Sequence, residues 1–102
     1  MEKYILSIDQ STSGTKALLF DETSDIICRT DIAHRQYVNE RGWVEHDPME
    51  IYRNTIAAVG KVIESAGIDK NRIIGAGVCN QRETALVWDK KTGLPVYNAI
   101  VW

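Results

Sequence analysis

The sequence has few of the features that mark secreted, metal-binding or disulfide-rich proteins. Its only cysteines, Cys28 and Cys79, are far apart, and each lies in a segment that we predict to be a strand. We expect two reduced, buried thiols, because a disulfide needs a geometry that spacing alone does not provide. The two histidines, His34 and His46, lack the close Cys or His pairing of a zinc site.

Long hydrophobic runs and excess positive charge are also missing. No stretch approaches the roughly 18 uninterrupted apolar residues that a membrane span needs. The first residues lead into a segment that is too short and too polar for a signal peptide, so we expect a cytoplasmic protein. The formal net charge of −2 argues against a broad surface for nucleic acid or anionic membranes. The length of 102 residues favours a single core.

The order of the predicted elements indicates an α/β domain with a mixed sheet. A helix lies between the third and fourth predicted strands, and such a helix crosses from one strand to a partner in the same sheet. The small residues of the fourth strand indicate burial. Three early runs, at residues 4–9, 15–20 and 26–34, predict an antiparallel meander. Three later runs predict further strands at residues 73–79, 85–88 and 100–102, and the last of these is expected to be an interrupted strand.

The predicted helix has clear signals at both ends. Asp47 is a suitable N-cap, Pro48 suits the first helical position, and Glu50 completes a capping-box pattern. Gly67 predicts the left-handed residue that ends the helix. Apolar residues at spacings of three and four predict one packed face, formed by Tyr52, Ile56, Val59, Ile63 and Ala66.

The polar bend after the first strand is a candidate phosphate site. A tight turn of small residues exposes backbone N–H groups that can bind phosphate oxygens, and the hydroxyls of residues 11–13 and the charge of Lys16 would add to them. Asp9, at the strand end, could hold a hydrated magnesium ion. An ordinary polar hairpin has the same composition. The segment is no Walker A loop, because the Gly-Lys-Ser/Thr ending is absent.

A second candidate is the polar segment 80–84 between two strands. Arg82 offers five N–H donors and Glu83 offers two acceptor oxygens, so the pair suits the neighbouring hydroxyl groups of a polyol. A solvent-exposed charged loop is the alternative. His46 could transfer protons, although a histidine beside a helix cap is more often simply hydrogen-bonded. Trp43, Trp88 and Trp102 are expected in the core on general grounds.

Four long motifs of the sequence are Gly-Trp-Val-Glu-His-Asp-Pro-Met-Glu-Ile at 42–51, Asn-Gln-Arg-Glu-Thr at 80–84, Trp-Asp-Lys-Lys-Thr-Gly at 88–93 and Tyr-Asn-Ala-Ile-Val-Trp at 97–102. These motifs resemble those of the FGGY family of carbohydrate kinases, and within it the glycerol kinase branch. The resemblance extends in register over essentially all 102 residues. It implies that residues 1–102 form the first part of domain I, without the rest of that domain or the ATP-binding domain II.

The resemblance implies a fold, a reaction and a set of site residues. The fold would be the ribonuclease H-like fold of the actin, heat-shock chaperone and sugar kinase group. The reaction would transfer the γ-phosphoryl group of ATP, with Mg²⁺, to a hydroxyl of glycerol. Arg82, Glu83 and Trp102 match substrate-binding residues, Asp9 matches the acid associated with the metal, and the nucleotide phosphates would be bound by Thr12, Ser13, Gly14 and Lys16.

The first loop departs from the usual pattern of glycerol kinases, which is Asp-Gln-Gly-Thr-Thr-Ser-Ser-Arg. This chain has Ser11, Ser13, Gly14 and Lys16 at four of these positions. Lys16 lacks the bidentate fork of the usual arginine. A kinase for another polyol or for a pentulose such as xylulose is therefore an alternative.

Outside enzymes, the same fold could serve as a nucleotide-dependent interaction module. The family's general base would lie beyond Trp102, so we expect no activity from residues 1–102 alone. The expected partners are a small polyol or sugar, with no nucleic acid or membrane, and a homo-oligomer at full length.

Overall fold

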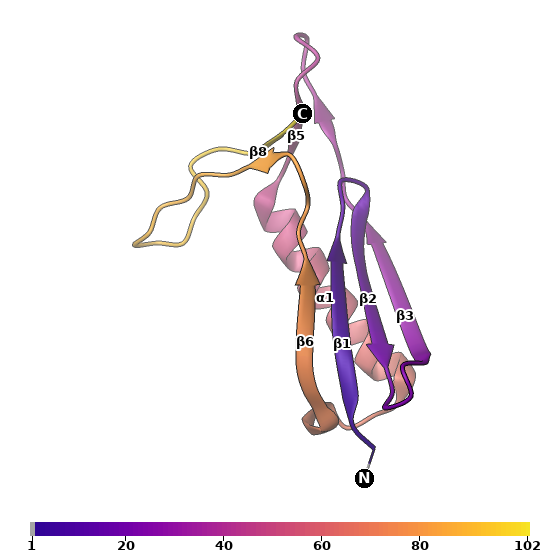
Figure 1. Ribbon diagram of the computed structural model, residues 1–102. Coiled ribbons are helices and arrows are strands. Elements are labelled where there is room, and N and C mark those ends of the chain that lie inside the picture. Colours follow the sequence, from indigo (N-terminus) through magenta and orange to yellow (C-terminus); the bar gives the residue numbers. More distant parts are fainter. Residues whose placement is uncertain (1) are drawn as a thin grey trace.

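The computed structural model describes residues 2–102, and Met1, the first residue of the predicted domain, lies outside the described residues. The main sheet has the strand order β3-β2-β1-β6 and is covered on one face by α1 (Pro48–Ala66) (Figure 1). β1 pairs antiparallel with β2 and parallel with β6, which confirms the mixed sheet. The strands are β1 (Tyr4–Gln10), β2 (Gly14–Phe20), β3 (Ile26–Ala33) and β6 (Ile73–Cys79), with a short 3₁₀ turn before β6 at Lys70–Arg72.

A second, smaller sheet lies beyond the end of the main sheet where β1 and β6 finish (Figure 1). Its order is β4-β5-β8-β7, and all of its pairs are antiparallel. The apolar end of the sequence therefore forms a central strand of this sheet, paired on both sides within the chain. The strands are β4 (Tyr37–Val38), β5 (Val44–His46), β7 (Thr84–Ala85) and β8 (Ala99–Val101).

The core forms between α1 and the sheet face that it covers. Alternate residues of β1 and β2 point toward the helix, because successive side chains of a strand point to opposite faces. Burial of these apolar side chains is the main source of stability. The buried cluster consists of Tyr4, Leu6, Ala17, Leu19, Ala58 and Val62.

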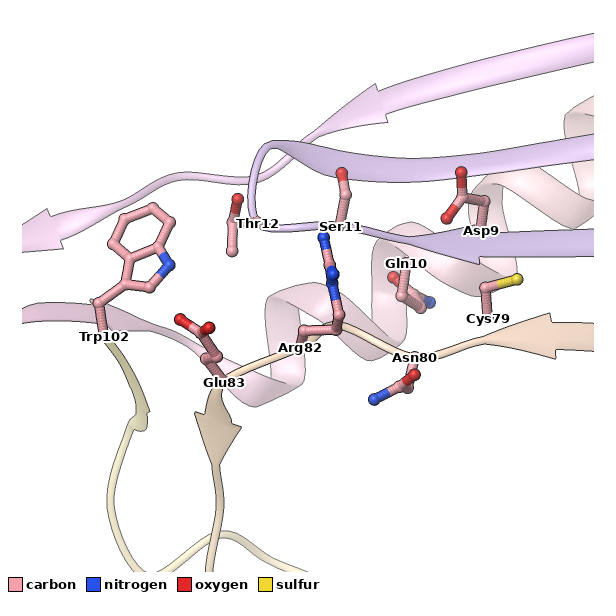
Figure 2. Close-up of a pocket in the computed structure, with 9 residues that line it drawn as sticks. All are labelled: Asp9, Gln10, Ser11, Thr12, Cys79, Asn80, Arg82, Glu83 and Trp102. Carbon is pink, nitrogen blue, oxygen red and sulfur yellow. The ribbon is translucent and has the colours of Figure 1, made fainter.

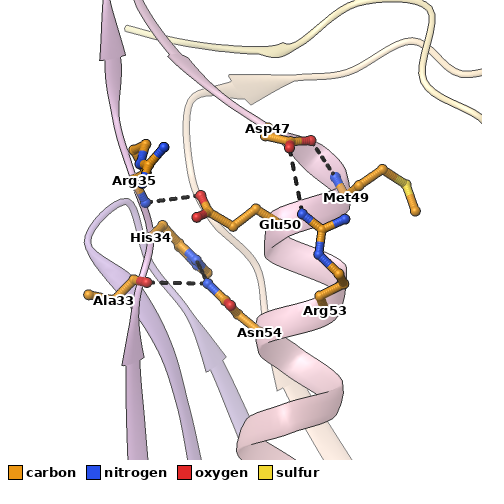
Figure 3. A network of polar contacts seen from close by, with 8 residues as sticks. All are labelled: Ala33, His34, Arg35, Asp47, Met49, Glu50, Arg53 and Asn54. Carbon is orange, nitrogen blue, oxygen red and sulfur yellow. Dashed lines mark hydrogen bonds and ion pairs between the residues drawn. The ribbon is translucent and has the colours of Figure 1, made fainter.

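The predicted ends of α1 are confirmed, but the capping box is not. A side-chain oxygen of Asp47 accepts a hydrogen bond from the backbone N–H of Met49 at 2.9 Å, and Gly67 ends the helix with φ 66°. The Glu50 carboxylate does not return to the N-cap. It accepts from the backbone N–H of Arg35 at 3.0 Å and so connects α1 to the segment after β3 (Figure 3).

The predicted packed face of α1 is only partly correct. Val59, Ile63 and Ala66 pack against the core, whereas Tyr52 and Ile56 are 57% and 59% exposed. The helix packs over β2 and β3, with Ala58 and Val62 in the core, whereas Tyr52 borders an open hollow between the start of the helix and the hairpin after β7.

β6 and the cysteines also differ from expectation. β6 was expected to be buried, yet it forms an edge of the main sheet, and Ile74 and Val78 are exposed. Cys28 and Cys79 do lie in strands as free thiols, but only Cys28 is even partly buried, and Cys79 is exposed. The expectation of two buried thiols is therefore wrong for Cys79, because α1 packs over β2 and β3 and leaves β6 uncovered.

The predicted strand at 85–88 is shorter than expected. β7 covers Thr84–Ala85, and the chain then forms a long hairpin that projects away from both sheets (Figure 1). Its two arms are joined by a bond from Val96 N–H to the Val87 carbonyl oxygen at 2.9 Å. Gly93, with φ 74°, supplies the left-handed residue of the tip. Within the described residues, no helix is long and apolar enough to cross a membrane.

Candidate functional site

An open cavity of about 570 Å³ lies where β1 and β6 end (Figure 2). These two strands are parallel neighbours, with Asp9 opposite Cys79, so their carboxyl ends reach the same edge of the sheet. In α/β proteins ligands bind at such an edge. The cavity is lined by Asp9, Gln10, Ser11, Thr12, Cys79, Asn80, Arg82, Glu83 and Trp102.

The cavity joins the two motifs that the sequence singled out. Asp9 lies near the end of β1 and Thr12 lies in the bend after it. Arg82 and Glu83 come from the segment after β6, and Trp102 directly follows β8 (Figure 2). Five of the predicted site residues therefore share one cleft. Their assigned roles in binding metal, phosphate and polyol stay predictions.

Ser13, Gly14 and Lys16 lie outside this cleft. They line a shallow hollow of about 250 Å³ against β3, and Ser11 borders both spaces. Lys16 stands opposite Asp9 on β1 and Asp31 on β3, so the three side chains share one face of the sheet. Lys16 can therefore add positive charge beside Asp9, on the side of the bend away from Arg82.

Hydrogen bonds within the bend give it a defined shape. Ser11 donates its backbone N–H to the Gly14 carbonyl oxygen at 2.9 Å, and its hydroxyl lies 3.1 Å from the Ser13 hydroxyl. His34 donates its backbone N–H to the Ser13 carbonyl oxygen at 2.9 Å, and the Gln36 amide donates to the Thr12 carbonyl oxygen at 3.2 Å. The bend is thus fixed by its neighbours before any ligand binds.

Arg82 and Glu83 present free functional groups to the cleft. Among residues 2–102, neither side chain makes a side-chain hydrogen bond or an ion pair, and both project into the cleft (Figure 2). The Glu83 backbone is in the left-handed region, with φ 56°. The Glu83 carbonyl oxygen accepts a hydrogen bond from the backbone N–H of Trp102 at 3.4 Å. This bond brings the backbones of the two residues together, and the indole lies beside the Glu83 carboxylate (Figure 2).

Trp102 forms an apolar wall of this otherwise polar cleft. Its side chain is 68% exposed, and its ring stands across from Thr12 and Glu83 (Figure 2). Trp43 and Trp88 are also exposed, so the general expectation of core tryptophans is wrong for all three. A flat, exposed indole beside charged groups suits a ligand that has both carbon–hydrogen and hydroxyl surfaces.

Buried polar side chains support the cleft from below. His34 and His46 lie side by side, with ring centroids 5.9 Å apart. Burial lowers the pKa of each imidazole below its usual 6.5, and the charge of His46 further lowers the pKa of His34, while the Glu50 carboxylate opposes both shifts. Both rings are therefore neutral at pH 7.

Sequence reasoning missed several residues of the site. Gln10 and Cys79 line the cleft but were not selected, and Gln81 supports it from behind with a bond to His46. The parallel pairing of β1 with β6 would have identified Cys79 as the partner of Asp9, but a strand order is needed to see this. Gln10 belongs to the polar segment that the sequence singled out, but no role in the site was assigned to it.

The donor set around Asp9 fits a hydrated magnesium ion. Asp9 is the carboxylate of this part of the cleft, and the neighbouring groups of Ser11 and Thr12 are oxygen donors. The described residues contain no group of three or more His, Cys, Asp or Glu that could enclose a metal ion. Mg²⁺ keeps several waters and is commonly held by one or two carboxylates together with substrate phosphates, so one acid is sufficient.

Comparison with known proteins agrees with the motifs. Residues 4–102 match the N-terminal domain of the FGGY family of carbohydrate kinases. Glycerol kinase 1 of Thermotoga maritima is 57% identical over 97% of the chain, and a glycerol kinase of Clavibacter michiganensis is 50% identical over 99% of the chain. The chain therefore belongs to the FGGY family of carbohydrate kinases.

Solved structures show the same fold. The structure of Plasmodium falciparum glycerol kinase with ADP matches 98% of the chain with a TM-score of 0.85 and 41% identity. A ligand-bound xylulose kinase from Lactobacillus acidophilus matches 98% of the chain with a TM-score of 0.80 and 24% identity, which is evidence for the fold alone. The predicted ribonuclease H-like fold is thus confirmed. The chain spans about a fifth of the length of each of these proteins (20%).

Proposed function

We propose that this chain is the N-terminal part of a longer kinase that transfers the γ-phosphoryl group of ATP to a hydroxyl group of glycerol. The observation that carries the proposal is the shared cleft, in which the bend at Asp9–Thr12 faces Arg82, Glu83 and Trp102. Relatives named as glycerol kinases are 47–57% identical over nearly the whole chain, which supports glycerol as the substrate.

The side chains of the cleft suggest how glycerol would be held. Arg82 would donate hydrogen bonds to the hydroxyl oxygens, and Glu83 would accept from the hydroxyl hydrogens. The indole of Trp102 would cover the carbon atoms and exclude water from them. Together the three residues would orient one hydroxyl toward the bend, because in phosphoryl transfer positioning provides much of the catalysis.

The bend would receive the phosphate end of the nucleotide. Its backbone N–H groups and the hydroxyls of Thr12 and Ser13 would donate to phosphate oxygens, with Lys16 adding positive charge. Asp9 would hold the waters of a magnesium ion, which when bound neutralises charge on the transferred group. Gly14 would keep the turn tight enough for a close backbone approach.

The general base and most nucleotide contacts would come from residues outside this chain. Transfer needs the nucleophile, the phosphoryl group and the base in one closed site. We also propose the cytoplasm as the location and a homo-oligomer as the assembly of the longer protein. A small polyol is the proposed partner, with no role for nucleic acid or membranes.

The substrate is tested by measuring ATP-dependent phosphorylation with the full-length kinase. Glycerol is expected to be used far better than xylulose or other sugars and polyols in a panel. Preference for a pentulose would favour the alternative substrate, which the departures at Ser11, Ser13, Gly14 and Lys16 suggest. Binding of nucleotide without any phosphorylation would favour an interaction module, and saturation-transfer NMR with glycerol would show whether the polyol binds.

The role of Arg82 gives a second test in the full-length kinase. Arg82→Ala removes five donors from the cleft, so KM for glycerol is expected to rise by roughly 10- to 100-fold, as for the loss of charged hydrogen bonds of about 1.5–3 kcal/mol. KM for ATP should change much less. Steady-state kinetics with each substrate varied in turn measures both values, and equal effects would contradict the assignment.

A further inference from the structure

The two buried histidines make matched hydrogen bonds but contact different parts of the cleft. His34 Nδ1 accepts from the amide nitrogen of Asn54 at 3.0 Å, and His46 Nδ1 accepts from the amide nitrogen of Gln81 at 2.9 Å. An amide NH₂ group can only donate, so neither Nδ1 atom carries a proton. His34 faces the bend through Thr15, whereas His46 faces the segment that carries Arg82.

A short chain of hydrogen bonds leads from His46 to the Arg82 backbone. Gln81 Nε2 has two hydrogens, and it donates one to His46 Nδ1 and the other to Thr84 Oγ1 at 3.0 Å. Thr84 in turn donates its single hydroxyl hydrogen to the Arg82 carbonyl oxygen at 3.1 Å. Each donor hydrogen in this series of hydrogen bonds is used once. The direction of the series, from Thr84 and Gln81 outward, requires that His46 Nδ1 is unprotonated.

The surroundings of His46 offer no substitute partner within the described residues. Its side chain is completely buried, and its Nε2 atom and the Oε1 atom of Gln81 are buried without a hydrogen-bond partner. Buried polar groups that lose a partner are costly, because no water replaces it. The contact between His46 and Gln81 therefore determines how Gln81 is oriented.

We propose that His46 is a positioning residue for the polyol: its neutral Nδ1 fixes Gln81 and, through Thr84, the backbone from which Arg82 and Glu83 reach the substrate. This inference rests on the proposed function of the Arg82 and Glu83 pair. His46 itself lies outside the cleft lining and acts through its neighbours.

Protonation of His46 would reverse the chain of hydrogen bonds. A proton on Nδ1 makes this atom a donor, so the Gln81 amide has to turn and present Oε1. The oxygen then also accepts from Thr84 Oγ1, and the Arg82 carbonyl oxygen loses its donor. The binding segment is consequently released when the imidazole becomes charged.

The groups around His46 determine when this happens. Glu50 on α1 and His34 after β3 are the titratable groups that face it, β8 places Ala99 opposite it, and Glu45 lies on the other face of β5. Burial is the main cause that lowers the pKa of His46 below 6.5, and the Glu50 carboxylate acts in the opposite direction. Polyol binding should therefore weaken only as the pH falls below 6.5 and His46 begins to take up a proton.

The test compares matched substitutions in the full-length kinase at pH 7.5. His46→Leu removes the acceptor, and we expect KM for glycerol to rise about tenfold, since a buried donor loses its partner. KM for ATP is expected to stay close to its wild-type value. His34→Leu is the comparison, because it removes an equivalent buried Nδ1 acceptor that has no bond to Gln81, and it should raise KM for glycerol much less than His46→Leu does.

A second variant separates positioning from folding. His46→Asn keeps an oxygen acceptor toward Gln81 but cannot titrate near neutral pH. In the wild type, KM for glycerol should rise only as the pH falls below 6.5, and in His46→Asn this rise should disappear while KM at pH 7.5 stays low. Thermal unfolding of each variant shows whether it is folded under the assay conditions.

The outcomes distinguish a failure of the positioning role of His46 from a failure of the proposed kinase function. If His46→Leu raises KM for glycerol and ATP equally, or if the rise at acid pH persists in His46→Asn, the positioning role is overturned while the kinase assignment stands. If the wild-type enzyme phosphorylates no polyol, the proposed function fails, and the inference fails with it.

Discussion

Gly14 is the point of closest approach between the bend and β3. A Cβ atom at this position would lie 2.4 Å from the Ile32 carbonyl oxygen and 3.1 Å from the Ala33 Cα atom. Both atoms belong to the backbone of a paired strand, so they cannot move aside without loss of the ladder. The requirement for glycine thus arises from packing, which is independent of any contact with phosphate.

We predict that Gly14→Ala destabilises the kinase by about 1–3 kcal/mol, as expected when extra volume is forced into a packed site. Gly60→Ala in α1 is the matched control, because an added Cβ there meets nothing within 4 Å. Alanine is the better helix former, so this control should stabilise by about 0.5–1 kcal/mol. Urea denaturation of the two variants measures both values, and equal stability of Gly14→Ala and the wild type would contradict the packing argument.

At the scale of single elements, local signals determined what the sequence could predict. The ends of α1 follow from Asp47, Pro48 and Gly67, whose effects depend only on the neighbouring backbone. The exposure of Tyr52 and Ile56 could not be predicted, because a helical period shows which residues share a face but not which part of that face a sheet covers. Glu50 formed no capping box because the Arg35 N–H lies within its reach.

The N-cap of α1 yields a prediction about stability. Asp47→Ala should lower the free energy of unfolding by about 1 kcal/mol, because the N–H of Met49 loses its acceptor. Asp47→Asn should retain most of the stability, since asparagine is an equally good N-cap. The ion pair between Asp47 and the exposed Arg53 spans 3.8 Å and should contribute little. Thermal unfolding measures the difference, and a loss of equal size in both variants would assign the effect to the charge.

At the scale of the whole molecule, the candidate site depends on strand order. The sequence identified Asp9, Thr12, Arg82, Glu83 and Trp102, but their meeting in one cleft requires β6 to lie parallel beside β1 and β8 to lie between β5 and β7. Such long-range pairings are not encoded in local periodicity. For the same reason the sequence did not show that Ser13, Gly14 and Lys16 lie outside the cleft, in the hollow against β3.

The proposed division of the catalytic groups between this chain and the rest of a longer kinase has a direct consequence. We expect residues 1–102 by themselves to show no glycerol-dependent release of ADP, because the cleft is open and, under the proposed function, the general base comes from residues outside this chain. A coupled assay of ADP release measures this, with the full-length kinase as the positive control. Turnover by the isolated chain would show that a complete active site lies within it.

β6 has a further effect on how the isolated chain would behave in solution. Its outer N–H and C=O groups have no neighbouring strand within the described residues, and Ile73–Cys79 contains neither a charged residue nor a proline. Natural sheets use such residues to discourage unwanted strand addition. With no strand beside it, this edge of the isolated chain would present an unprotected template, on which a second molecule could extend the sheet and begin to aggregate.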